Sequence, residues 1–78
     1  MVEVKVLGPG CRNCQRLYAA VAEAVRELGL AAEVEKVEDL ARIMSFGVMS
    51  TPALVVGGRV AVSGRVPGKE EVKKLLQG

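Results

Sequence analysis

The chain has 78 residues, a length that fits one small domain, and we predict a single domain over residues 1–78. Half of the residues are hydrophobic and 26% are charged, which excludes disordered, collagen-like and coiled-coil classes. The net charge is only +2, with both signs interspersed, so the composition gives no electrostatic reason to expect nucleic-acid binding.

The first predicted elements are a strand and a long helix. Valines alternate with charged residues at the start of the chain, and this period predicts a strand that ends at about Leu7, because Gly8-Pro9-Gly10 cannot continue it. Apolar residues then recur at steps of three and four through residues 12–28. That spacing predicts an amphipathic helix, which Gly29 ends.

A second strand and a second helix follow. Ala32 and Val34 alternate with glutamates, which again predicts a strand. The two acidic residues after it favour the start of a helix. In this helix we expect Leu40, Ile43 and Met44 to face inward.

The last third of the chain predicts a hairpin and a final helix. Pro52 leads into the unbroken apolar run 53–56, which is typical of an interior strand covered on both faces. Gly57-Gly58 then predicts a tight turn into an antiparallel strand over residues 59–63. Helical spacing near the end predicts a short third helix. The order is therefore β-α-β-α-β-β-α, an α/β fold in which three helices flank a four-stranded mixed sheet.

Other side chains receive simpler interpretations. We expect Tyr18 to be a core residue whose hydroxyl reaches the surface. Two positions are open for Phe46, Met44 and Met49: they would flank a substrate groove, or they would pack in the core around the end of the second helix, which is the commoner arrangement and the one we expect. The charged residues of the third helix are expected to form a solvated face: Lys69, Glu70, Glu71, Lys73 and Lys74.

The chemistry that the composition allows lies with two cysteines. The chain contains no histidine, which excludes Ser-His-Asp and Cys-His nucleophile pairs and histidine metal ligands. The motif Cys11-Arg12-Asn13-Cys14 stands where the first strand gives way to the first helix. Cys11 therefore falls at a helix N-terminus, where unpaired amides and the helix dipole stabilise a thiolate. Arg12 and Arg16 add positive charge nearby.

These positions predict two different roles for the cysteines. Cys14 begins the apolar stripe of the helix and is expected to face inward, one turn from Cys11. Cys11 would attack a substrate disulfide, and Cys14 would then resolve the mixed disulfide. A purely structural disulfide over so short a loop would stabilise the fold by only about 2 kcal/mol.

Metal binding is the main alternative, because two cysteines are also soft ligands for Cu(I). Small copper chaperones of the heavy-metal-associated family carry the same motif at a strand-to-helix junction. They follow the order β-α-β-β-α-β, however, and typically have Met where this chain has Pro9. These differences argue against a copper chaperone of that family, and our expectation is that no metal is bound. A Cu(I) or other soft-metal carrier and a non-catalytic binding module are kept as alternatives.

The arrangement of motifs along the whole chain resembles the thioredoxin/glutaredoxin superfamily. The cysteine pair opens the first helix, Thr51-Pro52 precedes the apolar strand, and Gly57-Gly58 forms the hairpin before a terminal helix. The chain is most similar to the minimal thioredoxin-like redox-active disulfide proteins of archaea and bacteria. This resemblance implies a thioredoxin-like fold and thiol-disulfide oxidoreductase activity, with no cofactor besides the redox-active disulfide.

The resemblance also implies further site residues and partners. In that family the proline is cis and packs beside the disulfide, and the residue before it offers its backbone to an extended substrate. Thr51 and Pro52 are the matching positions here, and recognition through main-chain hydrogen bonds would admit many clients. The implied partners are disulfide-containing client proteins and a disulfide reductase or other thiol donor.

The chain also departs from typical thioredoxins. Gly10 precedes Cys11 where they have Trp, and Arg12-Asn13 replaces their Gly-Pro. We identify no interior acid, because Glu3, Glu33 and Glu35 are expected to face solvent. Because of these departures, the redox potential of typical thioredoxins is not assigned to this chain. Whether the chain depends on glutathione stays open.

The expected location and assembly are simple. No apolar run approaches the roughly 18 residues that cross a bilayer. Residues 1–5 lack the basic-then-apolar order of a signal peptide. We therefore expect a cytoplasmic monomer without membrane contact.

Overall fold

The computed structural model describes residues 2–77 and contains seven helices and strands in the predicted order. These are β1 (Val2–Leu7), α1 (Arg12–Leu28), β2 (Ala32–Val37), α2 (Leu40–Ser45), β3 (Ala53–Val56), β4 (Arg59–Ser63) and α3 (Lys69–Gln77). The predicted fold class is confirmed. None of the helices in this part of the chain combines the length and apolar character needed to cross a bilayer.

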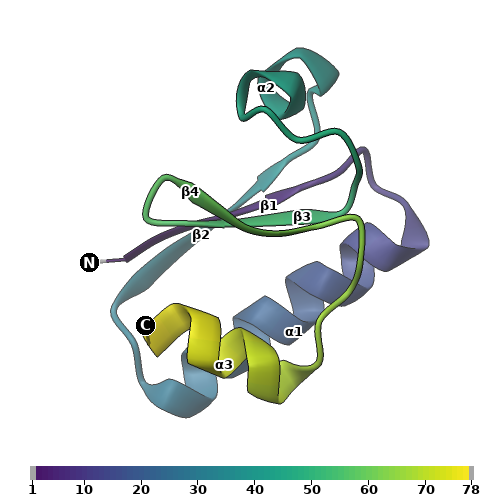
Figure 1. Cartoon of the computed structure of the whole chain (residues 1–78). Helices are drawn as coiled ribbons and strands as arrows, with labels where there is room; N and C mark the ends of the chain where they lie inside the picture. Colours follow the sequence, from purple (N-terminus) through teal and green to yellow (C-terminus); the bar gives the residue numbers. More distant parts are fainter. Residues whose placement is uncertain (1, 78) are drawn as a thin grey trace.

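The four strands form one mixed sheet in the order β2-β1-β3-β4. β1 is parallel to β2 and antiparallel to β3, which pairs antiparallel with β4. Helices α1 and α3 cover one face of the sheet and α2 lies on the other (Figure 1). Because Leu7 at the end of β1 pairs with Ala53 at the start of β3, the segments after Leu7 and before Ala53 leave the sheet at the same end of the strands.

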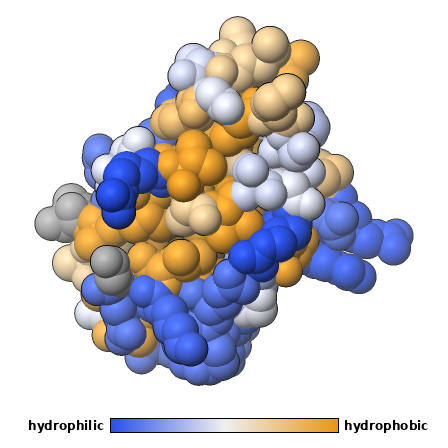
Figure 2. All heavy atoms as spheres, viewed as in Figure 1, coloured by the Kyte–Doolittle hydropathy of each residue, from blue (hydrophilic) through white to orange (hydrophobic). Residues whose placement is uncertain are grey.

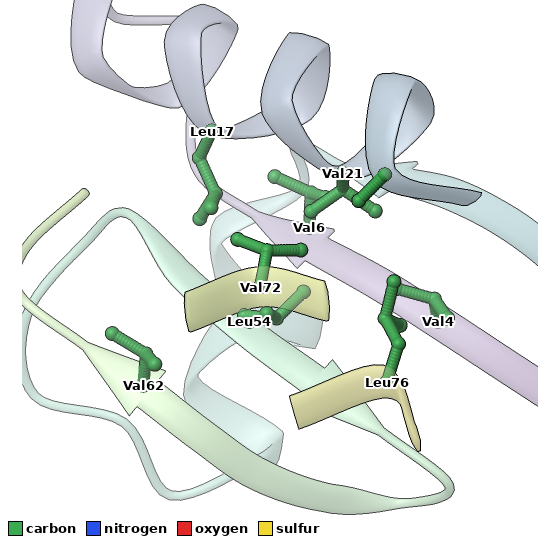
Figure 3. Packing of buried hydrophobic residues seen from close by; sticks show 9 residues of the cluster. Val4, Val6, Leu17, Val21, Leu54, Val62, Val72 and Leu76 are labelled. Carbon is green, nitrogen blue, oxygen red and sulfur yellow. The ribbon is translucent and has the colours of Figure 1, made fainter. Parts of the chain in front are cut away.

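The larger hydrophobic cluster lies between the sheet and the α1/α3 layer. Side chains of both helices point toward β1, β3 and β4 in this layer (Figure 3). Its buried members are Val4, Val6, Leu17, Val21, Ala24, Leu54, Val62, Val72 and Leu76. Burial of this apolar surface is the main favourable contribution to folding.

A smaller cluster lies under α2. It contains Leu7, Val37, Ile43, Ala53 and Val55. These residues come from the ends of β1 and β2, from β3 and from α2. The second cluster therefore lies on the α2 face of the sheet, toward the end of the strands at which the cysteine segment leaves.

The expectation that Leu40 and Met44 face inward is wrong. Their exposed fractions are 63% and 65%, and only Ile43 of α2 is buried. Met49 was expected in the core but is 99% exposed. For Leu40 and Met44 the physical reason is that α2 has six residues, fewer than two turns, so only a narrow stripe of it reaches the sheet. Met49 lies in the loop between α2 and β3.

Capping residues fix the ends of the helices. Asp39 precedes α2, and its carboxylate accepts a hydrogen bond from the Arg42 backbone N–H at 3.0 Å, which satisfies one of the unpaired amides at the helix start. Gly29 ends α1 in the left-handed conformation, with φ of 64°, which glycine adopts without steric cost. Both boundaries follow from local sequence.

Charged side chains join α1 to α3. Lys69 contacts Glu23 at 3.2 Å and Glu27 at 2.7 Å, and Lys73 contacts Glu27 at 2.6 Å. The hydrogen bonds from Lys69 and then Lys73 lower the pKa of Glu27 to about 2. The expectation of a purely solvated face on α3 is therefore wrong for Lys69 and Lys73, which bridge two helices.

Candidate redox site

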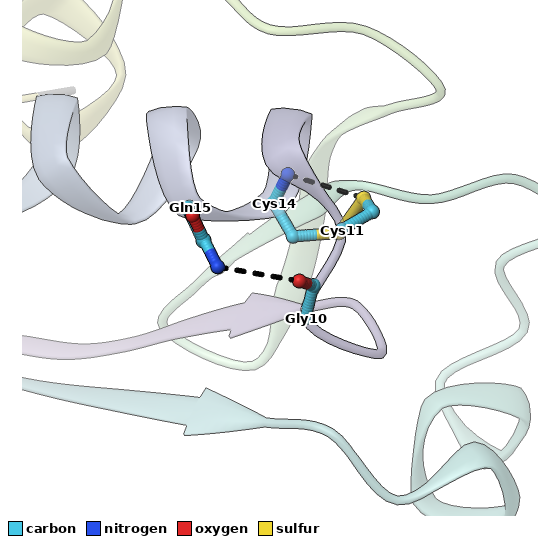
Figure 4. The surroundings of a disulfide bond; sticks show 4 residues. All are labelled: Gly10, Cys11, Cys14 and Gln15. Carbon is cyan, nitrogen blue, oxygen red and sulfur yellow. Dashed lines mark hydrogen bonds between the residues drawn. A yellow bond between two sulfur atoms is a disulfide. The ribbon is translucent and has the colours of Figure 1, made fainter.

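The two cysteines form a disulfide at the start of α1. Their Cα atoms are 5.0 Å apart, and the pair follows the short segment after β1 (Figure 4). Cys11 is exposed, whereas Cys14 is 5% exposed and packs at the inner face of the helix. The predicted difference in burial between the two cysteines is confirmed.

The helix start polarises the Cys11 sulfur. Cys11 is the N-cap residue of α1, and its Sγ accepts a hydrogen bond from the Cys14 backbone N–H at 3.2 Å. In the reduced protein the same donor and the positive end of the helix would favour a thiolate at Cys11. The geometry therefore supports a nucleophilic sulfur at the surface.

Gly8 is a site residue that the sequence interpretation missed. It is buried, and a Cβ atom built on it would overlap Cys14 Sγ and lie 2.9 Å from Cys14 Cβ. The backbone just after β1 thus passes directly against the inner sulfur, and only glycine leaves that space. The sequence signal was present in Gly8-Pro9-Gly10, which we interpreted only as the end of a strand.

The segment before β3 leaves the sheet at the same end as the cysteine segment. The Thr51–Pro52 peptide bond is cis, as the resemblance implied. Pro52 is buried and Thr51 is exposed. The Pro52 carbonyl accepts a hydrogen bond from the Gly64 backbone N–H at 2.9 Å, so the segment after β4 holds this loop.

Gly64 is a second missed residue. Its φ is +79°, and a Cβ atom there would lie 3.0 Å from Ser50 Cβ. An L side chain at this position would be strained and would press on the loop that carries Thr51. The loop before β3 therefore depends on a glycine that follows β4.

A cavity of about 90 Å³ opens beside Cys14 on the side of β2. Lys36, Glu38 and Gln15 line it together with Cys14. The Lys36 ammonium also lies 4.6 Å from the centre of the Tyr18 ring, a favourable cation–π distance. Parallel pairing of β1 with β2 brings Lys36 and Glu38 to the cysteines, although nothing in the local sequence marks them, whereas Gln15 belongs to α1 itself.

An apolar groove of about 410 Å³ has Thr51 among its lining residues. It runs between α2 and the following loop, and Leu40, Met44 and Met49 form its exposed walls. These side chains are therefore available on the surface beside the loop before β3, instead of in the core as expected.

The fold and the cysteine pair define a thioredoxin-like thiol-disulfide oxidoreductase. Three features occur together in this chain: the sheet order β2-β1-β3-β4, the cysteine pair at the start of α1 and the cis-proline before β3. Comparison with known proteins identifies the family. The sequence matches the thioredoxin domain family over residues 2–77, so the chain belongs to that family.

Curated relatives match along nearly the whole chain. A thioredoxin of Methanothermobacter thermautotrophicus is 43% identical over 76 residues, which cover 97% of this chain and 99% of the relative. A thioredoxin of Methanocaldococcus jannaschii is 36% identical over 77 residues, which cover 99% of this chain and 88% of the relative. A probable thioredoxin of Methanothermobacter marburgensis is 33% identical over 80 aligned positions.

Proposed function

We propose that the chain reduces disulfides of proteins or small molecules by two-step exchange. The Cys11 thiolate attacks one sulfur of the substrate disulfide and expels the other as a thiolate. The Cys14 thiolate then attacks the Cys11 sulfur and releases the second substrate thiolate. Two electrons pass to the substrate, and the Cys11–Cys14 disulfide is left behind.

The observation that carries this proposal is the asymmetry of the pair. Cys11 is exposed at the helix N-terminus and accepts the Cys14 N–H, whereas Cys14 is buried one turn further on. An exposed, stabilised thiolate suits attack on a large substrate. A shielded thiol next to it suits the intramolecular second step, because it meets the mixed disulfide at high effective concentration.

Thr51 and Pro52 would position the substrate. Thr51 is exposed in the segment before β3, which leaves the sheet at the same end as the cysteine segment, and its backbone can pair with an extended polypeptide. Such pairing reads the main chain more than the side chains, which fits a reductant of several clients.

The remaining parts of the proposal concern supply and setting. A disulfide reductase or other thiol donor would return two electrons to the Cys11–Cys14 disulfide after each cycle, and disulfide-containing proteins would be the clients. The pair itself is the only redox group required. We place the activity in the cytoplasm, in a monomer whose single domain spans residues 1–78.

The test is to trap the intermediate. Cys14→Ser should accumulate a mixed disulfide through Cys11 when incubated with insulin, because the second step is removed. Cys11→Ser is the matched control and should trap none. Mass spectrometry of the intact adduct gives the readout. Absence of an adduct with Cys14→Ser, combined with Cu(I) binding by the reduced wild type, would overturn exchange in favour of metal carriage.

A further inference from the structure

A second groove lies between β4 and α3, away from the redox site. It measures about 500 Å³ and is lined by Val56, Arg59, Val60, Ala61, Lys74 and Leu75. β3 begins beside the cysteine segment and ends at Val56. Three residue steps along that strand correspond to about 10 Å, so the groove lies toward the other end of the sheet.

The groove combines apolar walls with two positive charges. Val56 and Arg59 are register partners, so their side chains leave the same face of the sheet, the face that α3 covers. Val60 pairs with Val55, which packs on the α2 side of the sheet, so the Val60 side chain leaves the opposite face, where it is 42% exposed. Figure 2 shows apolar side chains gathered over the sheet side of this region, with hydrophilic side chains along its borders.

The two cations of the groove differ from the other basic residues around α3. Lys69 and Lys73 are held by glutamates, and Arg65 is held by Glu71. Within residues 2–77, neither Arg59 nor Lys74 lies within ion-pair distance of a carboxylate.

β4 also offers its backbone, because it is an edge strand of the sheet. An edge strand presents N–H and C=O groups to an added chain. The register shift opposite Leu54 and Val55 limits regular pairing to the first part of β4, which is the part that lines the groove.

We propose that this groove is a docking surface for an extended acidic segment of a partner protein, one that alternates carboxylates with large apolar side chains. The carboxylates would neutralise Arg59 and Lys74 on the face that α3 covers, and the alternate apolar side chains would lie on the opposite face, against Val60. Because the groove lies away from Cys11, a partner held there leaves the redox site open.

The experiment uses a defined probe and the full chain. An acetylated, amidated heptapeptide of alternating glutamate and leucine is titrated into the oxidised protein, and backbone amide shifts are followed by NMR. We expect saturable shifts in residues 59–61 and 74–75, with little change at Cys11 and Cys14. A matched peptide of alternating lysine and leucine should not bind.

Charge reversal tests the role of the two cations. The double variant Arg59→Glu/Lys74→Glu should weaken binding of the acidic peptide at least about tenfold, because two attractive pairs become repulsive. Arg26→Glu reverses an exposed charge on α1 and should change the affinity less than about twofold. Both variants should retain insulin reduction, so failure of this proposal is distinct from failure of the redox function.

Several outcomes would overturn the docking proposal. These are equal binding of the two peptides, shifts confined to the cysteine segment, unchanged affinity in the double variant, and absence of shifts at millimolar peptide. Concentration-dependent shifts in residues 59–61 without peptide would also overturn it, since they would identify a second copy of the chain as the occupant.

Discussion

Replacing Gly8 with serine tests the close approach of the backbone just after β1 to the inner cysteine. The new Cβ would overlap Cys14 Sγ and stand 2.9 Å from Cys14 Cβ. Cys14 cannot move away easily, because it is 5% exposed and belongs to the first turn of α1. Added volume in a packed interior costs about 1–3 kcal/mol. For a domain of this size, each kcal/mol lowers Tm by roughly 4–8 °C, so Tm should fall by at least about 4 °C.

Thermal unfolding followed by circular dichroism measures the effect in oxidised and reduced protein. Gly68→Ser is the matched control, because no atom lies within 4 Å of a Cβ built there. The Gly68 carbonyl accepts the Val72 N–H at the start of α3, and serine is favoured at such a position. Its Tm should equal or exceed that of the wild type.

The same substitution should slow the second step of exchange. A misplacement of 1 Å can cost about 100-fold in rate, and the clash bears directly on the Cys14 sulfur. Rapid mixing of the reduced protein with a small aromatic disulfide gives the rate of resolution, as the release of the second aromatic thiolate after the first. If Gly8→Ser matched Gly68→Ser in both Tm and resolution rate, Gly8 would have no special role at the site.

Three further predictions concern stability and the loop before β3. In the folded chain the pKa of Glu27 is about 2, below its ordinary 4.5. The ion pairs of Glu27 therefore stabilise the fold fully above about pH 4.5, and this stabilisation is lost as the pH falls through about 2. Tm measured against pH should be flatter over this range for Glu27→Gln than for the control Glu33→Gln. Asp39→Ala should reduce the free energy of unfolding in urea by about 1 kcal/mol through loss of the α2 cap, and Asp39→Asn should retain most of it. Gly64→Ala should cost about 1–2 kcal/mol from the left-handed backbone, and its contact with Ser50 should lower kcat/KM for insulin more than for a small aromatic disulfide.

Periodicity was sufficient to predict the elements and their order. The alternation in β1, the helical spacing of α1 and the apolar run of β3 each reflect which faces are buried, and these local patterns survive in the fold. The Cys11/Cys14 asymmetry was predictable for the same reason, because helix phase determines which cysteine faces inward.

The sequence could not predict contacts that depend on pairing between distant segments. Gly8 matters because α1 folds back over β1, and Glu38 reaches the cavity beside Cys14 because β1 and β2 are parallel. The error at Leu40 and Met44 has another origin. Their apolar character indicated burial, but a helix of six residues covers too little of the sheet to bury them.

The core is divided into two clusters, so the residues that support the cysteine pair differ from those that support the surface beside Thr51. The larger cluster supports α1 and the cysteine pair, whereas the smaller one supports α2 and the exposed groove that Thr51 helps to line. Substitutions at Leu40, Met44 or Met49 change the surface beside the site without repacking the layer under α1. The surface beside Thr51 can therefore change in shape and polarity while the redox pair keeps its geometry.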